Sequence, residues 1–132
     1  MIHPSLLLRR AILLDAVVSG VMALLLTFDA STLASLLDLP ETLLRESGLF
    51  LIVYVLLIGR LGTRQLMPRT MVLIVIGGNV AWTLASIALS FSGMVSPNLL
   101  GEIVIVAQAI ASGTFAELQY IGMRKSGRAL AA

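Results

Sequence analysis

Cysteine is absent from this sequence of 132 residues, and histidine occurs once, as His3. Without cysteine the chain has no disulfides, no thiol catalysis and no thiolate metal sites. The single histidine lies close to the N-terminus, which we expect to be mobile, so a histidine metal site or catalytic dyad is not indicated. We therefore expect no metal, no cofactor and no enzymatic activity.

Charge is also scarce, because Asp, Glu, Lys and Arg make up 12% of the residues and hydrophobic residues 58%. A soluble domain usually carries about 25% charged residues. The mean hydropathy is +1.02, and no polar stretch is long enough to build a separate soluble core. These numbers predict a single integral membrane domain over residues 1–132, with the lipid bilayer as its surroundings.

Long apolar runs are what the sequence has instead. A bilayer core of about 30 Å needs roughly 20 apolar residues in a helix. Four runs reach that length, and they cover approximately residues 6–28, 48–66, 70–91 and 97–123. All four should be helices, because an open strand in lipid leaves backbone groups without hydrogen-bond partners. The predicted fold is an all-α membrane protein, a bundle of four transmembrane helices.

The connections between these runs differ in length. Pro68 lies in the second connection, where it ends one helix or opens the next. Pro97 follows the third connection and suits the first turn of a helix, where its missing N–H is not needed. The first connection is longer and contains STLASLLDL, in which Leu33, Leu36 and Leu37 fall on one helical face. We predict a short amphipathic helix here, lying in the membrane interface. The alternative is an ordered loop with its leucines against the bundle.

Positive charges predict the orientation of the bundle. The basic residues near the termini and the second connection are Arg9, Arg10, Arg60, Arg64, Arg69, Arg124, Lys125 and Arg128. The first connection has only Arg45 against four acidic residues, and the third has no charge. The positive-inside rule then puts both termini and the second connection in the cytoplasm, and we expect a multi-pass membrane protein with the first connection on the opposite side. A pI near 9.7 does not indicate nucleic-acid binding here, because the cations cluster at span ends.

Each predicted span carries one strongly polar residue in its cytoplasmic half: Asp15, Arg60, Asn79 and Glu117. Charged groups in lipid normally face the bundle interior and pair with one another. We therefore predict one intramembrane cluster of these four residues, with Arg60 bridging the carboxylates through its planar fork. The alternative is that Arg60 and Glu117 reach the headgroups separately, without a cluster.

Small residues also indicate which helix faces point inward. Ala109 and Gly113 precede Glu117 at intervals of four residues, and such a stripe lets a neighbouring helix approach closely. We expect large aliphatic residues on most other positions to contact lipid. Trp82 and Tyr120 are interpreted as packing or interfacial residues.

Three stretches carry a resemblance: AILLDAVVSG from Ala11, GNVAWTLAS from Gly78 and FAELQYIGMRK from Phe115. They resemble the signature stretches of small bacterial four-span integral membrane proteins of unknown function. This resemblance covers nearly the whole chain and implies a bacterial inner-membrane location, which puts the first connection and its amphipathic helix in the periplasm. It implies no activity. Arg60 lies outside the three stretches.

Three classes of function remain open from the sequence. The first is a non-enzymatic protein that acts by helix packing, as an accessory or scaffold subunit, a homo-oligomer or a membrane-protein partner. The second is a small proton- or cation-linked transporter or channel that uses Asp15 and Glu117, since intramembrane acids mark such pathways. The third, a membrane enzyme acting on lipid or quinone, ranks last because no nucleophile–base pair, metal cluster or phosphate loop is recognisable.

Overall fold

The computed structural model of the chain describes residues 1–128 and is built almost entirely of helices. The elements in chain order are β1 (Ile2–His3), α1 (Leu6–Phe28), α2 (Ala30–Leu37), α3 (Glu41–Thr63), α4 (Arg69–Phe91), α5 (Leu99–Arg124) and β2 (Gly127–Arg128). Four helices, α1, α3, α4 and α5, are long and apolar enough to cross a membrane. The protein is a polytopic membrane protein with a four-helix bundle, and the predicted fold class is confirmed.

Two helix boundaries differ from the prediction. α3 begins at Glu41, directly after Pro40, although the apolar run begins only at residue 48. Apolarity marks the part of a helix suited to lipid, whereas backbone hydrogen bonding continues into the polar residues before it. The expectation that Pro97 lies in the first turn of the last span is wrong. The N-cap of α5 is Asn98, and its side chain accepts a hydrogen bond from the Gly101 N–H at 2.8 Å.

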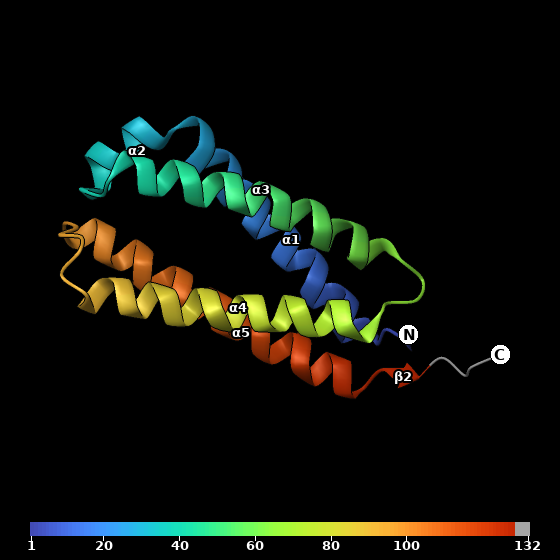
Figure 1. Cartoon of the computed structure of the whole chain (residues 1–132). Coiled ribbons are helices and arrows are strands. Elements are labelled where there is room, and N and C mark those ends of the chain that lie inside the picture. Colours follow the sequence, from blue (N-terminus) through green and yellow to red (C-terminus); the bar gives the residue numbers. More distant parts are fainter. Residues whose placement is uncertain (129–132) are drawn as a thin grey trace.

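The four long helices form two pairs that share a central contact (Figure 1). α1 packs along α3, α4 packs along α5, and α1 also packs on α5. α3 and α4 are consecutive in the chain, yet their backbones hardly touch, and their ribbons diverge toward the end that carries α2. Side chains rather than backbone contact must therefore close the seam between α3 and α4.

Glycine makes the close contacts on α1 possible at both ends of the bundle. A Cβ added at Gly122 of α5 would lie 2.6 Å from the backbone nitrogen of Leu8, and one at Gly48 of α3 would lie 2.7 Å from that of Thr27. Both distances are too short for a real contact, so a side chain at either position would push the helices apart. Small residues serve the same purpose in other membrane bundles.

Apolar side chains form two buried clusters, one toward each end of the bundle. The cluster nearer the termini includes Ile12, Ile58 and Val72. The cluster nearer α2 includes Ala23 and Leu51. The polar residues described below lie between these two clusters.

The short helix α2 lies between α1 and α3, as the sequence predicted. Leu37 is buried and Leu36 is half exposed, so one face of α2 packs on the bundle and the other is open. Asn98 donates hydrogen bonds to the carbonyls of both residues, at 2.7 Å to Leu36 and 3.2 Å to Leu37. α2 ends at Asp38, whose left-handed backbone (φ 56°) suits a helix C-cap.

The end with both termini is tied together by hydrogen bonds. Ile2 exchanges backbone bonds with Met67 at 2.8 and 3.0 Å, and β1 pairs with β2. Arg9 donates to the carbonyls of Gly62 and Arg64, which joins α1 to the end of α3. The expectation of a mobile N-terminus is therefore wrong, because Ile2 is 4% exposed and paired on two sides.

Candidate functional site

A buried carboxylate, Asp15 of α1, organises the polar interior of the bundle. It is 1% exposed. Its Oδ2 accepts hydrogen bonds from the Tyr54 hydroxyl at 2.8 Å, from the Asn79 amide at 2.8 Å and from the Gln119 amide at 2.9 Å. Its Oδ1 accepts from the Ser19 hydroxyl at 2.8 Å. We call these five residues the Asp15 network, and every long helix contributes to it.

Asn79 and Gln119 close the network on the side away from Ser19. The Asn79 amide donates both to Asp15 and to the Gln119 carbonyl oxygen, the latter at 3.0 Å. Asn79 is 5% exposed and Gln119 is fully buried. Hydrogen bonds from three other helices thus meet on one oxygen of α1, and each requires the helices to keep their present positions.

The structure brings Asp15 and Asn79 into direct contact but leaves Arg60 and Glu117 outside the network. Both of these residues are exposed. The predicted cluster of four is therefore corrected: Gln119 and Tyr54 take the places assigned to Glu117 and Arg60. Within residues 1–128 the ion pair at 4 Å or less joins Arg45 to Glu41, far from this site in the chain.

Helix geometry explains why Gln119 replaces Glu117. The stripe from Ala109 through Gly113 to Glu117 advances four residues at a time, or 400°, so it turns 40° per step around the helix. The buried face of α5 instead includes Ala116 and Gln119, which lie three residues and about 60° apart around the helix. At 100° per residue, Glu117 lies about 100° from Ala116 and about 160° from Gln119, so it points away from this face. Gln119 could have been found from the sequence by following the helical period of 3.6 residues.

Arg60 is displaced for a similar reason. α3 buries Leu51, Ile58 and Leu61, and Arg60 lies beside that face in the last turn of the helix. A long guanidinium side chain near a helix end can reach the membrane surface, so it has no need of a buried partner. Tyr54 lies on the inner side of α3 and reaches Asp15 with a neutral hydroxyl.

The electrostatics of the Asp15 network follow from its donors. All four donors are neutral groups, and an ionised carboxylate accepts hydrogen bonds without donating any. Oδ2 accepts three bonds and Oδ1 one. Among the described residues no Lys, Arg or His lies within ion-pair distance of Asp15. Oriented dipoles therefore stabilise the carboxylate without a formal counter-charge.

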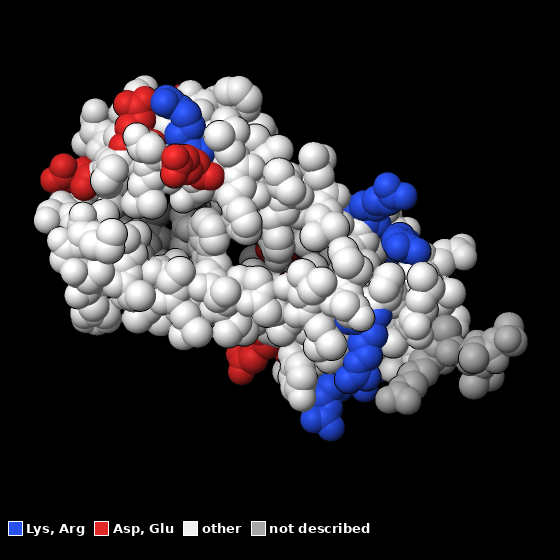
Figure 2. All heavy atoms as spheres, viewed as in Figure 1, with Lys and Arg blue, Asp and Glu red and all other residues white. Residues whose placement is uncertain are grey.

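A cavity of about 80 Å³ lies next to the network, between α3 and α4. Most of its lining is apolar, and its polar residues are Asp15, Ser19, Tyr54, Asn79, Gln108 and Ser112. Phe50 of α3 stacks on Trp82 of α4 with ring centroids 6.1 Å apart and 12° between the planes, so this pair bridges the seam. Figure 2 shows a hollow in this face of the molecule between the two helices.

Several larger hollows are mainly apolar. One, of about 340 Å³, adjoins the cavity, since Trp82 lines both, and its other walls include leucines of α2. Another, of about 410 Å³, is a groove on the outer side of α4 and α5. Glu117 lines this groove beside Val80 and Tyr120. Its carboxylate therefore faces an apolar surface that could lie against lipid, whereas Asp15 faces four donors.

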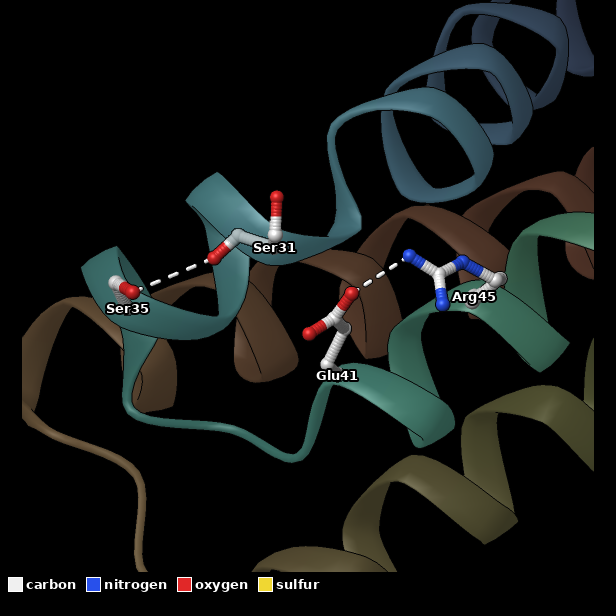
Figure 3. A network of polar contacts seen from close by, with 4 residues as sticks. All are labelled: Ser31, Ser35, Glu41 and Arg45. Carbon is white, nitrogen blue, oxygen red and sulfur yellow. Dashed lines mark hydrogen bonds and ion pairs between the residues drawn. The ribbon is translucent and has the colours of Figure 1, made fainter.

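The polar contacts at the α2 end have a different character (Figure 3). Arg45 bonds Glu41 at 2.6 Å, and the Ser35 hydroxyl donates to the Ser31 carbonyl at 3.3 Å. The two charged side chains are 52% and 44% exposed. An exposed ion pair of this kind contributes about 0–1 kcal/mol, and the contacts belong to helix ends rather than to a site. Within residues 1–128, no three His, Cys, Asp or Glu side chains are grouped to hold a metal.

Comparison of the chain with protein-family models, with curated proteins and with solved structures finds no match. The function must therefore be argued from the geometry of the bundle itself.

Proposed function

We propose that this polytopic membrane protein has no enzymatic activity and acts through helix packing, as an accessory or scaffold subunit or as a homo-oligomer. The observation that carries the proposal is the Asp15 network, in which neutral donors from α3, α4 and α5 converge on a carboxylate of α1. Such convergence fixes the positions of four helices relative to one another. A rigid bundle with an apolar outer surface is suited to association with other membrane proteins.

The absence of enzymatic activity is part of this proposal. The Ser19 hydroxyl bonds directly to Asp15, and this pair lacks the imidazole or amine that usually activates a serine nucleophile. The other members of the network are amides and a phenol that already donate to the carboxylate. Their hydrogen bonds suit mutual stabilisation better than acid–base chemistry.

The location and orientation also belong to the proposal. Basic side chains gather at the end with both termini, and acidic side chains gather mainly at the α2 end (Figure 2). The positive-inside rule then supports cytoplasmic termini in a bacterial inner membrane. Membership of the small bacterial four-span integral membrane proteins rests on the likeness of the three stretches quoted above.

A second function is favoured by one specific observation. Asp15 and Asn79 line a cavity that opens between α3 and α4, and carboxylates in such positions mark proton or cation pathways. Under this reading the protein is a small cation-linked transporter or channel. Asp15 then takes the role that the sequence had also assigned to Glu117.

Flux and stability measurements separate the two functions. The purified protein would be reconstituted in liposomes, and proton and cation flux would be compared with that of Asp15→Asn and of protein-free liposomes. The same variants would be melted in detergent. The packing function predicts no flux above the protein-free level and a lower melting temperature for Asp15→Asn. Wild-type flux that Asp15→Asn abolishes at an unchanged melting temperature would instead establish a transporter.

A further inference from the structure

We infer that the cavity between α3 and α4 binds the primary ammonium group of an amphipathic amine, with the ammonium on Asp15 and the apolar tail passing out through the seam into lipid. This binding goes beyond the proposed packing function, and it holds whether the network serves packing or transport. Charge, an acceptor position left on Asp15, the cavity lining and the position of the opening support this inference.

The first step is the charge of the site. Asp15 is 1% exposed and lines the cavity, and its four hydrogen-bond donors are all neutral. A buried charge without a counter-charge is costly in a medium of low dielectric constant. A cation in the adjoining cavity would offset that cost. The site therefore selects a positively charged ligand over a neutral or anionic one.

The second step is the acceptor that remains. Oδ2 accepts three hydrogen bonds, whereas Oδ1 accepts one, from Ser19. Each carboxylate oxygen offers about two lone-pair positions, so Oδ1, with one bond, is the oxygen with a position left. Ser19, Tyr54 and Asn79 line the cavity together with Asp15, whereas the fully buried Gln119 does not. A donor entering the cavity would therefore bind the carboxylate through Oδ1, beside Ser19.

The third step is the kind of cation. A metal ion such as Ca²⁺ or Mg²⁺ needs about six oxygen ligands, and this cavity is lined mainly by apolar side chains, among them Met22, Leu51 and Phe115. An ammonium needs only a few acceptors and is attracted by aromatic faces, of which Trp is the best. Trp82 and Phe50 supply such faces in the lining.

The fourth step is size and position. A volume of about 80 Å³ exceeds the roughly 10–15 Å³ that one water needs, so it holds a small head group, and any longer tail must leave the cavity. Gly78 of α4 lines the cavity and is exposed, and it lies about 14 Å along the helix from Arg69 at 1.5 Å per residue. That position is near the middle of the span. The ligand would therefore arrive from the lipid with its tail outward.

The chain contains one tryptophan, Trp82, whose fluorescence responds to binding in this cavity. Trp82 also borders the larger hollow next to α2, which Gly78 does not line, so the Gly78→Leu variant distinguishes the two. The protein would be placed in phosphatidylcholine nanodiscs and titrated with n-octylammonium, n-octanol and n-octyltrimethylammonium at matched membrane concentrations. We expect a saturable change in Trp82 emission for n-octylammonium. The half-saturation points of the other two should be at least about tenfold higher, because octanol has no charge and the trimethyl group is bulky and donates no hydrogen bond.

Single substitutions test whether the change in Trp82 emission comes from binding at Asp15. Asp15→Asn removes the charge and should raise the half-saturation point at least about tenfold. Gly78→Leu should do the same by filling the cavity: an added Cβ lies 3.9 Å from Tyr54 Cε2, an ordinary contact that leaves the backbone undisturbed. Glu117→Gln is the matched control, because that carboxylate faces the outer groove and its removal should leave the titration unchanged.

The source of the ammonium can be a free amine or an aminophospholipid. Replacing part of the phosphatidylcholine by phosphatidylethanolamine distinguishes the two sources. If the site binds the lipid headgroup, phosphatidylethanolamine competes and raises the half-saturation point for n-octylammonium. If the site binds only free amines, the half-saturation point stays the same. Either result supports the ammonium site. Equal half-saturation points for n-octylammonium and n-octanol would overturn the ammonium site. A titration of Gly78→Leu that matched the wild-type titration would overturn it as well. These two results stand even where Asp15→Asn fails to fold.

Discussion

Asp15 and Glu117 are two carboxylates within predicted membrane spans, and the bundle treats them in opposite ways. Asp15 is 1% exposed and accepts four hydrogen bonds. Glu117 is exposed and lines an apolar groove on the outer side of α4 and α5. Both helices are long and apolar enough to cross a membrane, so the difference comes from which face of the helix each residue occupies. A carboxylate in a membrane helix thus acquires a role through its neighbours rather than through its depth alone.

The largest effect should come from replacing Asp15 by leucine. Asp15→Leu leaves the donors of Tyr54, Asn79 and Gln119 without their acceptor. At about 0.6–1.7 kcal/mol for each interhelical hydrogen bond, the free energy of unfolding should fall by about 2–5 kcal/mol. Glu117→Leu is the matched control and should not lower it. Reversible unfolding in mixed micelles measures both values, and equal losses would contradict the distinction between the two sites.

A smaller loss of stability is expected for Gln119→Leu, because Gln119 makes two interhelical hydrogen bonds whereas Asp15 makes three. Its amide donates to Asp15, and its carbonyl oxygen accepts from Asn79. The free energy of unfolding should fall by about 1–3 kcal/mol in the same assay. A loss as large as that of Asp15→Leu would show that the fully buried amide, and not the carboxylate, holds the network together.

Tyr54→Phe removes one hydroxyl from the network and leaves the ring in place. The hydroxyl donates to Asp15 at 2.8 Å, so the free energy of unfolding should fall by about 0.6–1.7 kcal/mol. Tyr120→Phe supplies the control, since the Tyr120 side chain is half exposed beside Glu117 in the outer groove. Thermal melting of the two variants should differ; a pair of identical curves would argue that the Tyr54 bond contributes nothing.

The smallest effect is expected for Glu117→Gln. This substitution keeps the shape of the side chain and removes its charge at an exposed position. Surface changes of this kind usually alter the free energy of unfolding by less than about 0.5 kcal/mol. A clear loss of stability in detergent would mean that Glu117 has a partner within the folded protein. A change seen only in the oligomeric state, measured by light scattering, would place that partner in a second copy.

The composition and the apolar runs were sufficient to predict four membrane helices and the short helix between the first two. Part of the site was also predictable: Asp15 and Asn79 were both expected to face the interior, and they form a hydrogen bond. Arg60 and Glu117 were assigned inward on the assumption that charged residues in a span must pair. Position near a helix end and rotation around the helix allow them to remain exposed instead.

The sequence by itself determined that this chain crosses the membrane as helices, because long apolar runs cannot leave their backbone groups unpaired in lipid. It also determined which residues are polar enough to need partners there. Only the tertiary structure decided which partners they find, since Gln119 and Glu117 are both strongly polar and lie two residues apart, or about 160° around the helix. The same holds for the seam between α3 and α4. Each of these helices packs mainly on another helix, so side chains rather than backbone contacts close the space between them.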